Sequence, residues 1–207
     1  MAPFRLPVME LGAVVGTGVG HLLFKYFGVK GLFIALASVF WTVYIVRKVG
    51  RDPKAWENWG FRTDNLLEAF FLPTVLFVVA TGVMAWYAVS NGKMLWQGHM
   101  LFLLVLYPVW GILQQFLVQA LGVANLLKIF PQFRLCIAMS AGVILFAVVH
   151  YPDWVLMAAT GLLACVFIPL YIRYRNLWPL GLYHGWLATF FYLWVLGQDP
   201  WVTVFGK

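Results

Sequence analysis

Long apolar runs separated by short polar turns recur along the whole sequence, and they constrain its fold more than any other feature. Most runs are about 20 residues long, the length of helix that crosses a bilayer's hydrocarbon core of roughly 30 Å. The run over residues 99–129 is longer, and we expect it to be tilted, broken near residues 108–111, or continued as an interfacial helix. We predict an all-α bundle of transmembrane helices, with about seven spans (six to eight), in a single domain over residues 1–207. The expected spans are residues 7–27, 31–46, 65–88, 99–129, 135–150, 154–172 and 177–196.

The charge distribution supports a membrane location and argues against a nucleic-acid partner. Only 10% of the residues are charged, whereas a soluble domain of this size has about a quarter. The net charge of +7 comes from 14 Lys and Arg, and these lie mostly in the short turns, where the bias of cytoplasmic loops toward positive charge explains them. One side of the predicted topology holds Arg5, Arg47, Lys48, Arg51, Lys54, Arg62, Lys128, Arg134, Arg173 and Arg175, and the other holds Lys25, Lys30, Lys93 and Lys207. We therefore expect the N-terminus on the cytoplasmic side of the membrane.

Polar side chains inside the apolar runs are the candidate functional residues. His150 and His184 lie in strongly apolar sequence, and Gln114, Gln115 and Gln119 lie in one expected span. Intramembrane ionisable groups usually face the bundle interior, and buried amides are costly without partners there. In a regular α-helix Gln115 and Gln119 share one face, with Gln114 beside it. We predict one buried polar site formed by these residues, although simple span counting puts His150 and Gln115 at different depths.

The order of these residues resembles a known family. A Gln-Gln pair with a third polar residue four positions later precedes Phe146-x-x-x-His150, a Leu-Trp-Pro turn at 177–179, and His184. The arrangement resembles the CPBP family over residues 110–191. This family, also called Abi, comprises bacterial relatives of CAAX prenyl endopeptidases. Its motifs are Glu-Glu-x-x-x-Arg, Phe-x-x-x-His, and a last His followed four residues later by Asn or Asp.

The resemblance implies an intramembrane site that hydrolyses a peptide bond, through either a bound metal such as zinc or a water activated by glutamate. The matched positions are Gln114 and Gln115 for the glutamates, Gln119 for the arginine, His150 and His184 for the histidines, and Ala188 for the final Asn or Asp. These departures matter because a carboxylate can serve as a general base near neutral pH and a carboxamide cannot.

We therefore expect a proteolytically inactive family member, acting as an accessory or assembly subunit in a hetero-complex with other membrane proteins. The resemblance to a bacterial family implies a bacterial inner or intracytoplasmic membrane. No cofactor is expected, and His150 and His184 are the ligands if a metal binds. Asp153 and Asn176 are further candidates for the polar site. Gly12, Gly16 and Gly20, four residues apart, would allow another helix to approach closely. Glu10 is expected to reach the membrane interface.

Two other functions stay open on the sequence. The first is an active intramembrane endopeptidase, of metallo- or glutamic type, in which Asp153, Glu68 or Glu10 replaces the lost carboxylates. The second is binding of a haem or a chlorophyll-type pigment, since a neutral imidazole can be an axial ligand. The candidate ligands are His21, His99, His150 and His184, but no two of them are paired on one helix.

Overall fold

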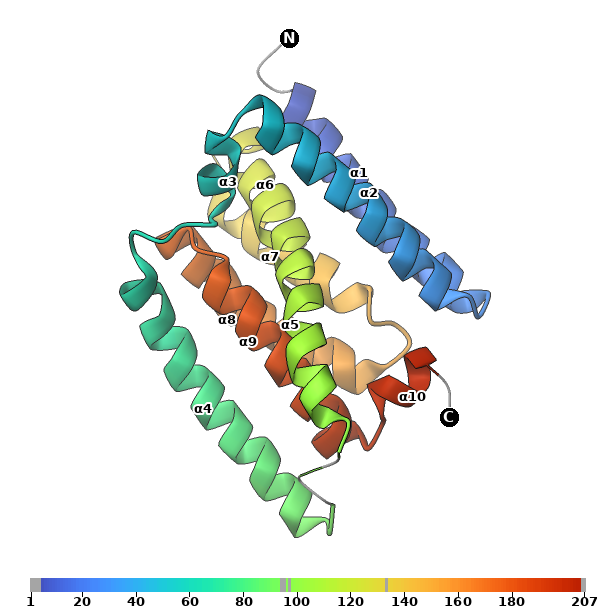
Figure 1. Cartoon of the computed structure of the whole chain (residues 1–207). Helices are drawn as coiled ribbons and strands as arrows, with labels where there is room; N and C mark the ends of the chain where they lie inside the picture. The colour runs from blue at the N-terminus through green and yellow to red at the C-terminus, as the bar shows by residue number, and fades with distance from the viewer. Residues whose placement is uncertain (1–4, 94–95, 97, 133, 206–207) are drawn as a thin grey trace. The chain divides into compact units, whose positions relative to one another are not determined.

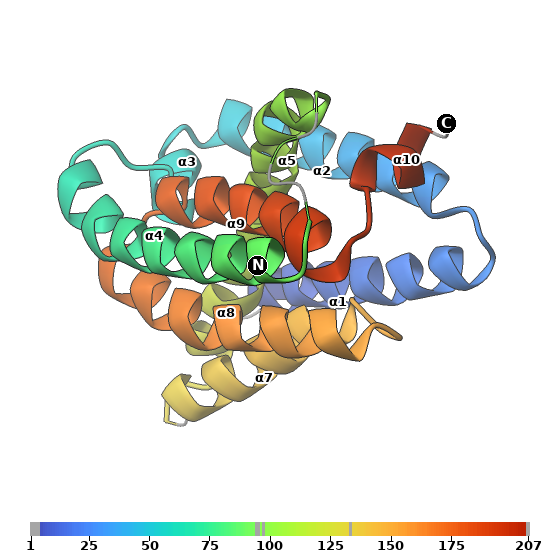
Figure 2. The ribbon, with the colours of Figure 1, turned by 90° about the horizontal axis from the view of Figure 1, so that it is seen from below.

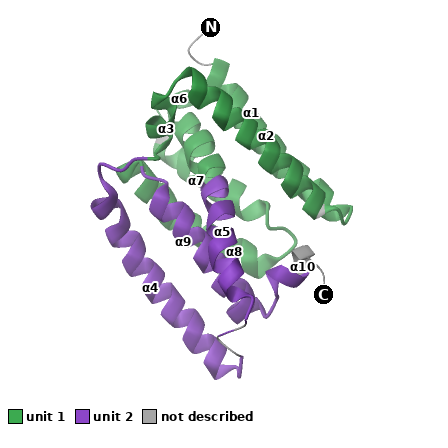
Figure 3. Cartoon of the chain, viewed as in Figure 1, with its two compact units in different colours: residues 1–61, 116–175 green, residues 62–115, 176–207 purple. Residues whose placement is uncertain are grey.

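The computed structural model describes residues 5–93, 96, 98–132 and 134–205. Helices and turns make up this part of the chain, and it contains no strand, so the predicted all-α class is confirmed (Figure 1). The contacts divide the chain into two compact units (Figure 3). Unit 1 comprises Met1–Phe61 and Phe116–Arg175, and unit 2 comprises Arg62–Gln115 and Asn176–Lys207. The single domain stays a prediction.

Unit 1 is built from two helical hairpins and a π-helix. Its helices are α1 (Arg5–Tyr26), α2 (Lys30–Arg51), α3 (Lys54–Trp59), the π-helix η1 (Phe116–Val123), α6 (Ala124–Ile129), α7 (Arg134–Val148) and α8 (Trp154–Tyr174). The first hairpin pairs α1 with α2 through a turn in which Gly28 has φ +74°, a backbone conformation suited to glycine. The second pairs α7 with α8, which lie side by side (Figure 2).

Only part of the predicted glycine face in α1 is packed within unit 1. A Cβ added at Gly20 would lie 2.8 Å from the ring of Phe33, so α2 approaches α1 closely there. At Gly12 and Gly16 an added Cβ would meet nothing within 4 Å. These two glycines are exposed on the outer side of α1.

Unit 2 contains α4 (Leu66–Ser90), α5 (Met100–Gln115), α9 (Trp178–Phe190), the π-helix η2 (Phe191–Leu196) and α10 (Pro200–Phe205). Both α4 and α5 pack on α9. On the α4 side, the hydroxyls of Thr74 and Tyr183 lie 2.7 Å apart and Phe77 stacks on Tyr183. Lys93 Nζ donates to the carbonyls of Trp194 and Val195 at 2.9 and 2.7 Å, which satisfies carbonyls at the end of η2.

Five helical segments are long and apolar enough to cross a membrane: Arg5–Tyr26, Gly31–Arg51, Leu66–Ser90, Met100–Ile129 and Trp154–Tyr174. The shorter apolar helix Leu135–Val148 covers most of another expected span. Candidate membrane-spanning helices are thus found at five of the seven predicted positions, and the count of seven is not confirmed. The last expected span, residues 177–196, is divided into the 13-residue α9 and the π-helical η2.

The apolar segment over residues 99–129 is longer than a bilayer is thick, and a break in the helix near residues 108–111 was one of the expectations for it. The helix instead continues through Pro108, and its geometry changes later, in the π-helix η1. The irregular stretch is thus next to the Gln-Gln pair that ends α5.

Candidate functional site

His184 and Gln114 meet inside unit 2. His184 lies on α9 with only 5% of its surface exposed, and Gln114 lies in the last turn of α5. The Nε2 atom of His184 is 3.0 Å from Oε1 of Gln114. An amide oxygen only accepts hydrogen bonds, so His184 donates through Nε2–H in this arrangement. Gln114 therefore fixes the direction in which the Nε2–H of His184 points.

Three glycines allow this contact by bringing the backbones of α5 and α9 together. A Cβ added at Gly111 would lie 2.8 Å from the backbone nitrogen of Gly185, and one added at Gly181 would lie 2.6 Å from Cα of Ile112. Gly111 is one turn before Gln114 on the same face of α5, and Gly185 follows His184 directly. The small residues thus place the imidazole and the amide within hydrogen-bonding distance.

Gln115 and Gln119 are both buried, with 0% and 1% of their surfaces exposed. Gln115 is the last residue of α5 and belongs to unit 2, whereas Gln119 lies in η1 and belongs to unit 1. The predicted shared face assumed regular α-helix, but a π-helix bonds residue i to i+5 and changes the register. Their membership of one polar site stays a prediction.

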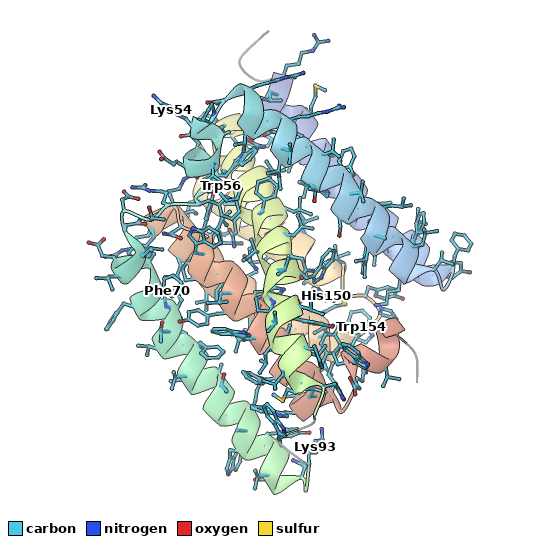
Figure 4. All side chains as sticks on the ribbon, viewed as in Figure 1. Lys54, Trp56, Phe70, Lys93, His150 and Trp154 are labelled. Atoms are coloured by element: carbon cyan, nitrogen blue, oxygen red, sulfur yellow. The ribbon has the colours of Figure 1, made fainter. Side chains whose placement is uncertain are left out.

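His150 belongs to unit 1, where it ends the second motif. Its Nδ1 is 2.8 Å from the carbonyl oxygen of Phe146, four residues earlier, and the two rings meet edge to face at 5.8 Å. The Phe-x-x-x-His spacing therefore places the two residues one helical turn apart, where they contact each other directly. Lys25 Nζ donates to the carbonyls of His150 and Tyr151 at 3.4 and 2.7 Å. Figure 4 labels His150 in this turn. A joint site with His184 stays a prediction.

The other two predicted polar residues have structural partners. Asp153 is the N-cap of α8, and its Oδ1 accepts from the backbone N–H of Leu156 at 2.9 Å. Asn176 is 1% exposed and begins unit 2's second segment. Its Nδ2 donates to the carbonyl of Arg62 at 3.0 Å and to Oδ1 of Asn65 at 2.8 Å.

Replacing Asp153 with alanine should lower stability by about 1 kcal/mol, because α8 loses the side chain that caps its first turn. Thermal unfolding of the purified protein in mild detergent measures the effect. Asp153→Asn is the matched control, since asparagine caps equally well but carries no charge. Equal losses in the two variants would show that the charge, and not the cap, stabilises this end of α8.

A second polar cluster, in unit 1, was missed from the sequence. The carboxylate of Glu10 accepts from the hydroxyl of Tyr44 at 2.5 Å and from Nδ2 of Asn125 at 2.7 Å. Asn125 is buried and also donates to the carbonyl of Leu121. Glu10 thus joins α1, α2 and α6, and the expectation that it reaches the membrane interface stays a prediction. The only signal was an acid within an apolar run.

The remaining histidines have partners of other kinds. His99 Nε2 lies 2.8 Å from Oδ2 of Asp199 in unit 2. His21 meets the ring of Phe33 edge to face in unit 1, with 5.6 Å between ring centres. Binding of a tetrapyrrole by any of these histidines stays a prediction.

Comparison with protein families identifies the region that contains these residues. The family described as type II CAAX prenyl endopeptidase Rce1-like matches residues 96–191. This region belongs to that family. Comparison with curated proteins and with solved structures found no match. The family agrees with the resemblance seen in the sequence motifs. Together with the apolar helices, it identifies an integral membrane protein that is CAAX protease-like.

The Rce1-like region runs from just before α5 to the first residue of η2, so it begins earlier than the expected residue 110. It contains both motif histidines and all three glutamines. It also contains Asn125, through which Glu10 of α1 is tied to the family region.

The candidate site residues lie in two units, and within neither do the described residues gather the donor set of a zinc enzyme. Zinc sites in enzymes use three protein ligands from His, Cys, Asp or Glu. No group of three or more such residues gathers anywhere in residues 5–93, 96, 98–132 and 134–205. The neighbour of His184 is an amide, which carries no negative charge to offer a cation. We therefore derive no step through a metal.

Proposed function

We propose that this chain is a non-proteolytic member of its family, and that it serves as an accessory or assembly subunit of a membrane protein complex. The observation that carries the proposal is the hydrogen bond between His184 and Gln114. His184 is held there by an amide, at a position that the motif resemblance matches to a family glutamate.

The chemistry of His184 and Gln114 favours a structural role for the pair over a catalytic role in hydrolysis. A general base must take a proton from water with a pKa near the working pH, which a carboxylate achieves and a carboxamide does not. The imidazole uses Nε2–H as a donor to Gln114, whose amide oxygen accepts the hydrogen bond but does not take up a proton. Such a bond links α5 to α9 without generating a nucleophile.

The outer face of α1 is consistent with a partner helix. Gly12 and Gly16 are exposed and an added Cβ at either would meet nothing within 4 Å. Small residues at this spacing let a second helix approach closely in a bilayer. The proposed orientation has the N-terminus on the cytoplasmic side, as the positive charge in the turns favours. The proposed location is a bacterial inner membrane, as the resemblance to a bacterial family suggests.

A pull-down from native membranes in mild detergent, analysed by size and mass spectrometry, tests the accessory role. We expect a stoichiometric hetero-complex, and we expect Gly12→Leu with Gly16→Leu to dissociate it. Gly82→Leu is the matched control, because Gly82 is also exposed and unobstructed but lies on α4. Elution of the wild-type chain alone would overturn the accessory role.

Glu10 supports a second candidate function, an active endopeptidase with a relocated carboxylate. Its carboxylate is oriented by Tyr44 and Asn125 and lies against the Rce1-like region, which has lost its own glutamates. If this function holds, purified protein cleaves a prenylated or membrane-embedded peptide, and Glu10→Gln abolishes cleavage.

A further inference from the structure

One end of unit 1 carries a concentration of positive charge that the proposed function does not use. The start of α1, α3, and the last residues of α2, α6 and α8 lie toward the same end of this unit (Figure 1). We call these cations the basic face: Arg5, Arg47, Lys48, Arg51, Lys54, Lys128, Arg173 and Arg175. The acidic residues near this end are Asp52, Glu57 and Glu10, and Glu10 is hydrogen-bonded to Tyr44 and Asn125, so most of the positive charge is unbalanced.

The basic face is held in place by the body of unit 1. Tyr171 of α8 donates its hydroxyl to the carbonyl of Trp59 at 3.0 Å, and Arg175 donates to the carbonyl of Asn58 at 3.2 Å. Trp59 is buried and meets Phe116 edge to face at 4.9 Å. The short helix α3, which carries Lys54, is therefore packed against the rest of unit 1 through these contacts. Figure 4 labels Lys54.

The charges of this face remain available to a ligand. Arg47, Arg51, Lys54, Lys128 and Arg173 are exposed. The ion pairs found among the described residues are Arg62 with Asp64 and His99 with Asp199, and both lie in unit 2. No carboxylate in the described part of unit 1 forms an ion pair with a cation of this face.

We propose that the basic face binds anionic phospholipid headgroups. Arg5, Arg51 and Arg173 stand at or beside the ends of α1, α2 and α8, which are long enough to cross the membrane. Cations in that position lie at the depth of the headgroups, where each raises the binding constant for an anionic leaflet by about fivefold. A lipid phosphate is thus the anion nearest to these side chains, and it accepts hydrogen bonds from both Arg and Lys.

Lipid retention tests the proposal on the full chain. The protein is reconstituted in vesicles of phosphatidylcholine with a minority of phosphatidylglycerol, extracted in mild detergent, and its co-purifying lipid is quantified by mass spectrometry. We expect phosphatidylglycerol to be enriched over the bulk by about fivefold or more. Enrichment should be lost in R47Q/K48Q/R51Q/K54Q and retained in R47K/K48R/R51K/K54R, which changes the same side chains but keeps their charge.

Salt provides a second readout that needs no variant. Raising the salt concentration before extraction should reduce the enrichment in the wild type, because exposed charges are screened. Equal enrichment in the neutralised variant, or enrichment that salt leaves unchanged, would overturn the proposal. The proposal would also fail if the neutralised variant kept its lipid but released a bound protein. The basic face would then bind an acidic segment of that protein and not a lipid headgroup. None of these outcomes depends on whether the chain is proteolytic.

Discussion

Gly185→Ala should destabilise the protein by about 3 kcal/mol, because the close contact between α5 and α9 has no room for a methyl group. The added Cβ would lie 2.5 Å from Cα of Pro108 and 2.6 Å from the carbonyl carbon of Tyr107. Both are backbone atoms, so the two helices would have to move apart. The movement would also separate His184 from Gln114, which meet at the same contact. Unfolding of the purified protein in detergent, by heat or denaturant, measures the loss.

Gly82→Ala is the matched control for this experiment. It makes the same chemical change in the middle of α4, where an added Cβ would meet nothing within 4 Å. Alanine favours helix over glycine by up to about 1 kcal/mol, so this variant should be unchanged or slightly more stable. Similar losses in the two variants would mean that the α5–α9 contact is looser than the structure shows.

Asn176→Ala should cost about 2–3 kcal/mol, since a buried polar junction would lose its central side chain. The amide of Asn176 donates to the carbonyl of Arg62 and to the side chain of Asn65, and its oxygen accepts from the N–H of Trp178 at 3.1 Å. It thereby ties the loop before α4 to the start of α9. The same unfolding measurement applies.

Two further variants make the Asn176 result specific. Asn91→Ala removes an exposed amide that donates to the carbonyl of Tyr87, and it should change stability by less than about 0.5 kcal/mol. Asn176→Asp keeps the acceptor for Trp178 and removes both donors, so it should be nearly as damaging as alanine. A fully stable Asn176→Asp variant would contradict the role given to the donors.

The membrane-spanning helices were predictable because the length of an apolar run is a local property. The run from Leu66 to Ser90 needed only composition to be recognised, and Pro73 did not interrupt it. The π-helices η1 and η2 were not predictable, because their residues are as apolar as those of the α-helices beside them. The exact end of a span was also uncertain. For α2, the structure continues to Arg51 whereas the apolar run ends at Val46.

The candidate site was predictable only in part. Polar residues within apolar helices pointed to His184 and Gln114, and the structure brings these two together. The glycine contact that makes this possible joins positions 69 or more residues apart, and nothing in the local sequence pairs them. The same limit hid the Glu10 cluster, whose partner Asn125 is 115 positions away. Such pairings depend on how helices pack, which periodicity does not determine.

Cleavage of a prenylated peptide by the purified wild-type protein is the most direct test of the central claim that the chain is not a protease. The assay is run with and without zinc, and His184→Asn serves as the reference because it removes the motif imidazole. The account predicts no cleavage by the wild type above that of His184→Asn under either condition. Cleavage by the wild type that His184→Asn abolishes would contradict it.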